Sequence, residues 1–330
     1  MKMLINAADT IVSDALNGLA QAHPGMVRVM RSPDYVIRAD APIKQKVAII
    51  SGGGSGHEPM HIGYVGRGML TAACPGAIFT SPTPDQILAA THAAAGDAGV
   101  LYIIKNYAGD RMNFEIAIET LLLEGIPVTS VIVADDVAHP NSDLRRGTGA
   151  TIIVEKIAGA AAEMGASLEE CTRVACHAER QCRSIGVALS ACTIPALDRP
   201  SFHLGDDEIE IGIGIHGEAG RHRTTLMPVS YIVDQLCSAL ADDLGLRAGD
   251  RTLALVNGLG ATTQIELYVA FYEVARWCAA HNIVIERSLV GNYMTSLDMA
   301  GCTITLMRLD DELLRLWDAP VCTPAMRWGL

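Results

Sequence analysis

The sequence has no long block of lysine or arginine, and its 37 acidic residues outnumber its 25 basic residues to give a formal charge of −12. Nucleic-acid surfaces need clustered positive charge, so this composition argues against a nucleic acid as partner. No apolar run approaches the roughly 20 residues that span a bilayer. Asp9 and Asp14 also interrupt the segment in which a signal peptide would be apolar. We therefore expect a cytoplasmic protein that does not engage a membrane.

Metal-binding and redox spacings are also missing. The nine cysteines form no CxxC pair, which is the spacing typical of zinc and dithiol redox sites. The clustered His203, His216 and His222 lack metal-ligand spacing on one element. The sequence therefore predicts reduced, mostly buried thiols and no metal site.

The composition that remains is that of a globular protein, with 50% hydrophobic and 19% charged residues over 330 positions. That length suits one large or two ordinary domains with a sizeable core. In the first half, short β-branched runs alternate with helical periodicity, which is the α/β signature. The predicted strands are residues 46–50, 99–104 and 126–133, and the predicted helices are residues 114–125, 150–165 and 167–186. Ser167 and Glu170 form a capping box that opens the last of these helices.

Residues 190–208 are predicted to form a linker or long surface loop, because they carry two prolines, an aspartate cluster and no sustained period. We place the domain boundary near this loop, with a first α/β domain at residues 1–184 and a second at residues 185–330. The second domain is predicted to contain a glycine-rich strand that begins at Ile209. Its other predicted elements are helices at residues 229–244 and 263–281, and strands at residues 251–260, 282–291 and 301–310.

The segment "SGGGSGHEP" (Ser51 to Pro59) is predicted to be a glycine-rich turn directly after a strand. At this position α/β proteins present backbone N–H groups to an anion or ligand. The segment is not a Walker A loop, since no lysine followed by serine or threonine ends it, and it does not fit GxGxxG. The alternative is a tight strand-to-helix turn in which His57 is structural.

A second glycine segment, "GIGIHGE" (Gly212 to Glu218), satisfies GxGxxG formally and would suggest a nucleotide-dependent oxidoreductase. We set that hypothesis aside because the following "EAGRHRTT" is charged and lacks the apolar helical face of a dinucleotide site. Glycine weakens a strand interior. The glycines around His216 therefore indicate either a bend in the chain or a histidine that a ligand can reach.

Two pairs of charged residues stand at the ends of predicted elements. Lys105 and Asp110 follow a buried strand, where an acid can act as general base toward a hydroxyl and a lysine can pair with an oxyanion. The alternative for this pair is an ordinary surface ion pair. Arg145 and Arg146 precede a helix and are interpreted as a solvated charge pair.

Eight segments, in this order along the chain, resemble the dihydroxyacetone kinase family in its substrate-binding K subunit. They are "SGGGSGHEPMHIGYVGRGML", "ACPGAIFTSPTPDQI", "IIKNYAGDRMNFEIA", "RRGTGATIIVEKIAGAAAE", "SIGVALSACTIP", "GIGIHGE", "LVNGLGATTQIELY" and "TSLDMAGCTITL". The resemblance spans about residues 7–330. It implies two α/β domains, each built on a mixed β-sheet flanked by helices, in a chain that forms a homodimer.

The resemblance also implies a function, that of the ketose-binding catalytic subunit of a kinase. His216 matches the histidine whose Nε2 binds the carbonyl carbon of a short ketose, dihydroxyacetone first, as a hemiaminal. His57 and Asp110 match the groups that contact the substrate hydroxyls and assist proton transfer. The implied pocket residues are Gly54, Ser55, Gly56, His57, Ser81, Lys105, Asp110 and His216. On this interpretation the glycines at 212, 214 and 217 leave clearance around the ring of His216 for the carbonyl group.

The sequence contains no segment that would bind the phosphoryl donor, since nothing matches the family's aspartate-rich "GDGDTG" segment that holds magnesium and phosphates. The resemblance implies that this chain binds no cofactor and that a separate L subunit carries Mg-ADP, rephosphorylated by a phosphotransferase-system M subunit, or Mg-ATP. Ala108 and Ala219 depart from the family's "KNYTGD" and "GIHGEPG", which leaves a C4 ketose such as erythrulose as an alternative substrate. A non-catalytic, ligand-sensing co-activator is a further alternative, because some paralogues have that role.

Overall fold

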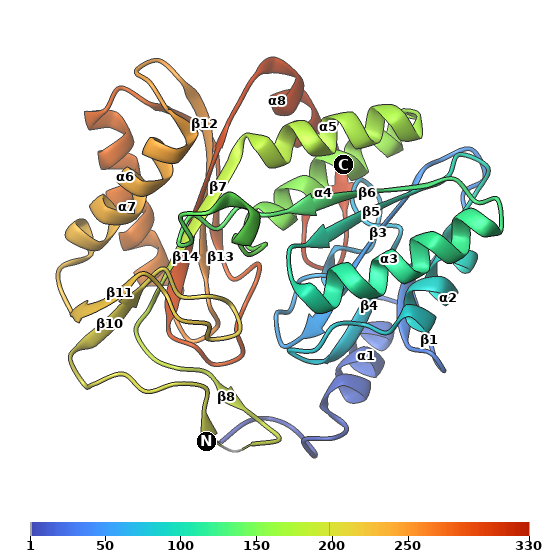
Figure 1. The fold of residues 1–330 in the computed structure, drawn as a ribbon, viewed down its shortest axis with the longest axis horizontal. Coiled ribbons are helices and arrows are strands. Elements are labelled where there is room, and N and C mark those ends of the chain that lie inside the picture. The colour runs from blue at the N-terminus through green and yellow to red at the C-terminus, as the bar shows by residue number, and fades with distance from the viewer. Residues whose placement is uncertain (1, 198, 330) are drawn as a thin grey trace. The chain divides into compact units, whose positions relative to one another are not determined.

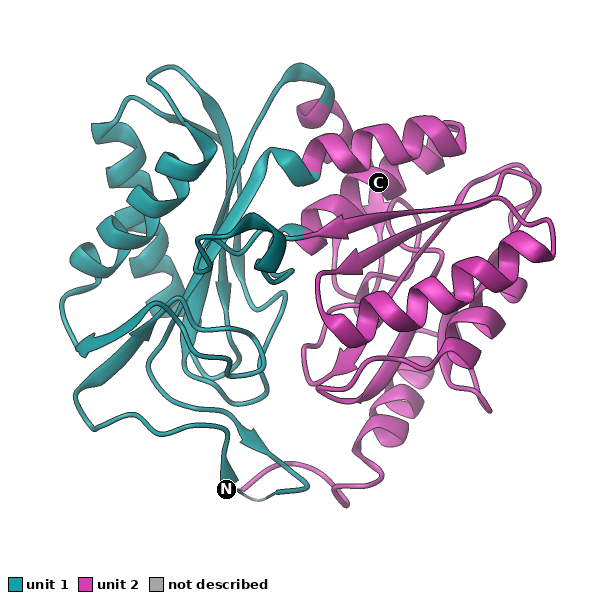
Figure 2. Cartoon of the chain, in the orientation of Figure 1, with its two compact units in different colours: residues 1, 134–150, 179–312 teal, residues 2–133, 151–178, 313–330 magenta. Residues whose placement is uncertain are grey.

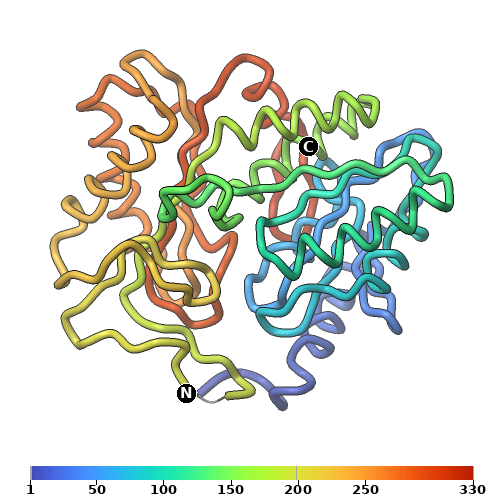
Figure 3. The backbone as a smooth tube through the Cα atoms, viewed as in Figure 1, coloured from blue at the N-terminus to red at the C-terminus, as the bar shows by residue number. Residues whose placement is uncertain are grey.

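The computed structural model describes residues 2–197 and 199–329. The described chain separates into two compact units, which Figure 2 distinguishes by colour. Unit 1 contains Ala134–Ala150 and Glu179–Glu312, and unit 2 contains Lys2–Val133, Thr151–Ala178 and the chain from Leu313 to residue 329. This division differs from the single cut predicted between residues 184 and 185, because the chain passes between the units more than once, as the tube in Figure 3 lets the reader follow.

Unit 2 is built on a mixed β-sheet whose strands lie in the order β1-β2-β4-β3-β5-β6. Strand β3 pairs in parallel with β4 and β5, and β5 with β6, whereas the pairs β1–β2 and β2–β4 are antiparallel. Helices α2 and α3 lie side by side and pack against this sheet (Figure 1). The strands are β1 (Val27–Met30), β2 (Tyr35–Arg38), β3 (Ala48–Ser55), β4 (Ala72–Ile78), β5 (Val100–Lys105) and β6 (Val128–Val133), and the helices of the sheet are α2 (Pro84–Ala94) and α3 (Ala108–Leu123).

The rest of unit 2 consists of helices and short strands outside this sheet. They are α1 (Ile11–Ala22), η1 (Ile62–Tyr64), most of α4 (Ala150–Glu163), α5 (Leu168–Arg180) and α8 (Asp311–Asp318), and the strand pair β15 (Val321–Cys322) and β16 (Arg327–Trp328). Helix α5 begins as predicted, with the backbone N–H of Glu170 donating to Ser167 Oγ at 3.2 Å. The capping side chain therefore satisfies an N–H group that the first helical turn leaves without an intrahelical partner.

The glycine-rich segment after Ile50 belongs to strand β3, so the prediction of a turn there is wrong. In the parallel register, Gly52 lies opposite Cys74 of β4. A Cβ at Gly52 would lie 2.7 Å from the Cys74 carbonyl oxygen, and one at Gly54 would lie 2.6 Å from the Thr80 backbone nitrogen. Side chains at these positions would push the neighbouring backbone away from β3. The turn begins only at Gly56, which has a φ of 101°.

Unit 1 is built on a second mixed sheet, in the order β11-β10-β7-β14-β12-β13. Only β12 and β13 run parallel among the paired strands of this described sheet. Figure 1 shows helices α6 and α7 together on one face of the sheet, where apolar side chains form the core of the unit. The elements of the unit are η2 (Ser142–Leu144), β7 (Cys182–Ala188), β8 (Thr193–Ile194), β9 (Arg199–Pro200), β10 (Glu208–Ile211), β11 (His222–Thr225), α6 (Val229–Leu244), β12 (Arg251–Gly258), α7 (Gln264–Ala280), β13 (Val284–Gly291) and β14 (Gly301–Arg308).

Mixed sheets with packed helices in both units confirm the predicted α/β fold class. Helix α6 has the predicted bounds, and the predicted helix and strands that follow it are each present within a few residues. Two further predictions are wrong. The helix predicted at 167–186 ends at Arg180, because Cys182–Ala188 forms a strand inside the sheet of unit 1. The strand predicted from Ile209 stops at Ile211, because the chain turns at Gly212.

Candidate functional site

His216 lies in a tight turn that follows β10 in unit 1. The N–H of Gly214 donates to the carbonyl of Glu218 and the N–H of Gly217 donates to the carbonyl of Gly214, each at 3.0 Å. Gly212 and Gly217 have φ angles of 86° and 81°, a region that side chains disfavour. The side chain of His216 is 20% exposed. Of the two interpretations of these glycines, a bend is therefore confirmed, and part of the ring remains accessible.

The space beside these glycines is filled by the chain itself, so the interpretation that they leave clearance for a carbonyl group is wrong. A Cβ would crowd Ala138 Cβ if added at Gly212, Glu218 Oε2 if added at Gly214, and Ser201 Oγ if added at Gly217. Glycine is needed here because the turn packs closely against other parts of unit 1.

Glu218 holds His216 at both its backbone and its ring. The N–H of His216 donates to Glu218 Oε2 at 2.9 Å, and Nδ1 of His216 lies 2.8 Å from Glu218 Oε1. Burial by itself would raise the pKa of Glu218, but the hydrogen bond and charge of His216 and the backbone N–H groups lower it to about 2. A carboxylate only accepts hydrogen bonds, so the ring hydrogen lies on Nδ1. In a neutral ring, Nε2 then carries the lone pair that a nucleophile needs.

Arg146 fixes the backbone of the same turn. Its Nη2 donates to the carbonyl of Gly212 at 2.7 Å, and its Nη1 lies 3.4 Å from the carbonyls of Glu218 and Ala219. Its Nε donates to Asp136 Oδ2 at 2.8 Å. Burial raises the pKa of Asp136 to about 6, even though the charge of Arg146 acts to lower it. The guanidinium therefore joins one carboxylate to three carbonyl groups of the turn, which its planar fork of donors permits.

The interpretation of Arg145 and Arg146 as a solvated charge pair is wrong, because both side chains are largely buried. Arg145 forms a bidentate pair with Asp243, with Nη1–Oδ1 at 2.9 Å and Nη2–Oδ2 at 2.5 Å. Both arginines therefore help to fix the structure of unit 1.

Lys105 and Asp110 form a buried pair in unit 2. Lys105 ends strand β5, Asp110 lies in the first turn of α3, and Nζ of the lysine is 3.6 Å from Oδ2 of the aspartate. Their side chains are only 1% and 4% exposed, which rules out the alternative of a surface ion pair. A Cβ at Gly53 would collide with Lys105 Nζ. The glycines of β3 therefore also make room for the lysine.

The other predicted residues of unit 2 lie around the end of β3. The ring of His57 is buried and stacks on Phe79, with 4.8 Å between the ring centroids. The N–H of Gly56 donates to Glu58 Oε2 at 2.8 Å, and burial raises the pKa of Glu58. Ser55 Oγ donates to the carbonyl of Gly76 at 2.6 Å, so this hydroxyl joins β3 to β4. Ser81 packs at the start of α3, where a Cβ at Gly109 would lie 2.7 Å from Ser81 Oγ.

Three residues that the sequence analysis did not single out extend from Lys105: His61 contacts the lysine, and Glu155 and Ser51 contact His61. Nε2 of His61 lies 2.9 Å from Lys105 Nζ, Nδ1 of His61 lies 2.6 Å from Glu155 Oε1, and Ser51 Oγ lies 3.1 Å from Nδ1. Glu155 and its neighbour Lys156 are the two charged residues of the mostly apolar stretch "ATIIVEKIAGAAA" of α4, a signal that sequence reasoning could have used. The predicted residues thus form two groups, each described within its own unit: His216 in unit 1 and the others in unit 2.

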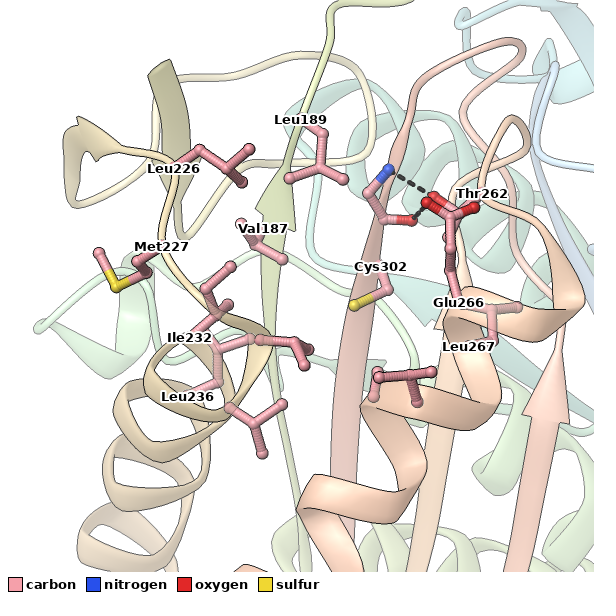
Figure 4. A pocket seen from close by; sticks show the side chains of 15 residues that line it. Val187, Leu189, Leu226, Met227, Ile232, Leu236, Thr262, Glu266, Leu267 and Cys302 are labelled. Carbon is pink, nitrogen blue, oxygen red and sulfur yellow. Dashed lines mark hydrogen bonds between the residues drawn. The ribbon is translucent and has the colours of Figure 1, made fainter. Parts of the chain in front are cut away.

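Unit 1 also contains an apolar cavity of about 230 Å³, lined by α6, α7, β7 and β14 (Figure 4). Its two polar side chains already have partners in the chain. Thr262 Oγ1 donates to the Gly301 carbonyl at 2.7 Å, and Glu266 Oε2 accepts from the N–H of Thr263 at 2.8 Å. The reactive groups described above are not among its lining residues.

The nine cysteines are buried or partly buried in the described chain, as predicted. Within residues 2–197 and 199–329, no cluster of three or more His, Cys, Asp or Glu side chains is placed to hold a metal ion. No helix of that described part is long and apolar enough to cross a membrane.

One unit thus holds an accessible imidazole beside a carboxylate, and the other holds a buried lysine–aspartate pair. The Dak1 domain model matches residues 17–325. The chain therefore belongs to the Dak1 domain family, and the resemblance to the dihydroxyacetone kinase family is confirmed.

Known relatives are similar over nearly the whole chain. The dihydroxyacetone-binding subunit DhaK of the PEP-dependent dihydroxyacetone kinase of Escherichia coli K12 is 48% identical, with 100% of both chains covered. The crystal structure of the dihydroxyacetone kinase of C. freundii matches with a TM-score of 0.91 and 35% identity, covering 98% of this chain and 60% of that one. The dihydroxyacetone kinase operon co-activator DhaQ matches with a TM-score of 0.88 and 35% identity, covering 94% and 96%.

Proposed function

We propose that this chain is the ketose-binding catalytic subunit of a dihydroxyacetone kinase, in which His216 holds the ketose covalently while a separate subunit supplies the phosphoryl group. The observation that carries the proposal is the geometry of His216, whose Nδ1 faces the carboxylate of Glu218 at 2.8 Å while part of the ring remains accessible. The full-length similarity to a dihydroxyacetone-binding subunit supports the choice of ligand.

The covalent step uses the lone pair of Nε2. This nitrogen forms a bond to the carbonyl carbon, the π bond of the carbonyl group breaks, and the carbonyl oxygen takes up a proton from solvent to become a hydroxyl. Positive charge develops on the ring as the bond forms, and the nearby carboxylate of Glu218 stabilises it. Only a carbonyl compound can form this hemiaminal. Glycerol has no carbonyl group, so it cannot form the adduct even though it is similar in size to dihydroxyacetone.

Phosphoryl transfer then becomes a positioning problem, because the covalent bond fixes the ketose and its terminal hydroxyl. Asp110 is proposed to accept the proton of that hydroxyl, assisted by His57. Gly54, Ser55, Gly56, Ser81 and Lys105 are proposed to line the pocket with them. Of these, Ser55 contributes through its backbone in this proposal, since its hydroxyl already donates to Gly76.

The phosphoryl donor is proposed to be Mg-ADP, rephosphorylated by a phosphotransferase-system M subunit, or Mg-ATP, on a separate L subunit. The PEP dependence in the name of the Escherichia coli relative favours the first. We further propose that the chain acts as a cytoplasmic homodimer in the metabolism of glycerol-derived ketoses.

Native mass spectrometry of the chain with dihydroxyacetone or erythrulose tests the covalent step. We expect the added mass of one ketose in the wild type and none in His216→Ala. His222→Ala is the matched control, because His222 is an exposed histidine of the same unit, and it should keep the adduct. An adduct that persists in His216→Ala would refute the assignment of the nucleophile.

Two alternatives remain for the same site. A C4 ketose would be favoured if kcat/KM with the L subunit and donor were higher for erythrulose than for dihydroxyacetone. A ligand-sensing co-activator is supported by the similarity to DhaQ. It would be favoured if the chain formed the adduct, supported no phosphoryl transfer with any L subunit, and bound a transcription regulator.

A further inference from the structure

Unit 2 contains a line of buried polar groups, of which the proposed chemistry uses Asp110 and Lys105 but not His61 or Glu155. It runs from Asp110 through Lys105 and His61 to Glu155, with separations of 3.6, 2.9 and 2.6 Å between successive polar atoms. None of the four residues is more than 5% exposed. The groups come from α3, β5, the loop before η1 and α4, so the tertiary fold brings them together.

The hydrogen bonds in this line have one consistent direction. A lysine ammonium is only a donor, so Nε2 of His61 accepts from Lys105. The hydrogen of a neutral ring must then lie on Nδ1, which faces Glu155 Oε1 and Ser51 Oγ. Ser51 already donates its own hydrogen to the Ile103 carbonyl at 2.7 Å, so its oxygen is free to accept. Both neighbours of Nδ1 are therefore acceptors, which supports the same assignment.

The charges of the surrounding groups agree with a neutral His61. Burial, followed by the charges of Lys105 and His57, holds the pKa of His61 well below its usual value. Burial raises the pKa of Glu155 to about 8, although the charge of Lys105 acts to lower it. A protonated carboxyl group keeps acceptor capacity, so Oε1 can accept from Nδ1 in either state of Glu155.

We propose that His61 and Glu155 are positioning residues, which hold the Lys105 ammonium beside Asp110 through a directed hydrogen-bond relay. We call Lys105, His61 and Glu155 the buried relay. Lys105 ends its strand, and its flexible side chain passes over Gly53. The relay fixes the ammonium group at the end of that side chain through the hydrogen bond to His61. This inference rests on the proposed function in one respect, namely that Asp110 and Lys105 act on the bound ketose.

Substitutions at Glu155 separate positioning from packing. Glu155→Gln keeps a carbonyl oxygen toward Nδ1 and should retain most of kcat. Glu155→Met fills a similar volume among the apolar side chains of α4 but offers no comparable acceptor. We expect it to lower kcat by about 10-fold or more, with KM for the ketose changed less than about 2-fold. Tm of each variant is measured alongside kcat, since removing one partner of a buried pair can destabilise the fold.

Controls distinguish the relay from a general effect on the protein. His92 and Glu124 form an exposed histidine–glutamate pair at 2.7 Å in the same unit, and His92→Gln should leave kcat unchanged. Glu155→Met should still form the His216 adduct in native mass spectrometry, because the bond is made by Nε2 of His216, which Glu155 is not described as contacting. If Glu155→Met keeps kcat within about 2-fold of the wild type, the positioning role is wrong.

Nitrogen NMR of ¹⁵N-histidine-labelled protein tests the relay without any assay of activity. The signals of His61 are identified among the ten histidines by their loss in His61→Phe. We expect a neutral ring with hydrogen on Nδ1 and a hydrogen-bonded, unprotonated Nε2. A ring with hydrogen on Nε2, or a charged ring at pH 7, would overturn the proposed direction. If the wild type forms no adduct and transfers no phosphoryl group, the proposed function fails while this spectrum still decides the relay.

Discussion

The charge of Glu218 should decide how tightly His216 holds a ketose. Glu218→Gln keeps an oxygen that can accept from Nδ1 but removes the negative charge 2.8 Å from the ring. The ring gains positive charge when Nε2 bonds to the carbonyl carbon, so loss of the carboxylate should weaken the adduct more than it disturbs the free protein.

The size of the effect follows from the pKa of Glu218, which falls from 4.5 to about 2. A shift of that size corresponds to about 3 kcal/mol. The side chain is 35% exposed, so solvent screening and the share due to backbone N–H groups reduce the part owed to the ring to about 1–2 kcal/mol. The concentration of dihydroxyacetone that half-saturates the adduct should therefore rise by about 10-fold.

Titration of the adduct by native mass spectrometry measures this directly at pH 7. Glu273→Gln is the control, because Glu273 pairs with Arg276 on α7 of the same unit and has no contact described with the turn. If Glu218→Gln and the wild type are half-saturated at the same concentration, charge stabilisation of the adduct by Glu218 is refuted. Glu218→Ala should weaken the adduct further, since it also removes both hydrogen bonds to His216.

Three further predictions concern the two units. Gly214→Ala should reduce adduct formation by about 10-fold or more while the protein stays folded, because the new Cβ displaces the side-chain ends of Glu218 and Arg146; near-ultraviolet circular dichroism checks the fold. The fold raises the pKa of Glu155 from 4.5 to about 8, so the contribution of Glu155 to the free energy of unfolding is fully present below pH 4.5 and is lost as pH rises through 8. Glu155→Gln does not titrate, so the difference in Tm between this variant and the wild type should shift in favour of the variant by about 2–4 °C from pH 5 to pH 8. Burial lowers the pKa of Lys156 from 10.5 to about 7, so the contribution of Lys156 to the free energy of unfolding is present above pH 10.5 and is lost as pH falls through 7. In urea unfolding, the free energy of unfolding of the wild type should therefore rise from pH 7 to pH 10 by about 1 kcal/mol or more relative to that of Lys156→Met.

The periodicity of apolar residues in the sequence was sufficient to predict helices that pack one face against a sheet. Helix α6 repeats apolar residues at helical spacing, and its buried residues are those of that repeat. Strand β7 was missed because its short apolar run follows an amphipathic helix with only Gln181 between them. The glycine-rich composition of this segment indicated a turn. The glycines instead lie in strand β3, where the close approach of the neighbouring strand β4 leaves no room for side chains.

Some residues of the candidate site could likewise be predicted from local sequence, and others could not. His216, His57, Lys105 and Asp110 could be named from their segments, since each motif is contiguous. The partner of His61 is 94 residues away in Glu155, and no local pattern joins the two. Glu218 is only two residues from His216, yet its role depends on a turn that brings Oε1 and Oε2 back to the ring and the backbone.

The two departures from the family pattern gain a physical meaning from the structure. Ala219 is exposed, and it meets the turn through its carbonyl, which lies 3.4 Å from Arg146 Nη1. A proline there would keep that carbonyl while restricting φ, so alanine changes the stiffness of the turn and not its acceptors. Ala108 is also exposed, at the first position of α3. Neither alanine lies among the contacts described for His216 or Lys105.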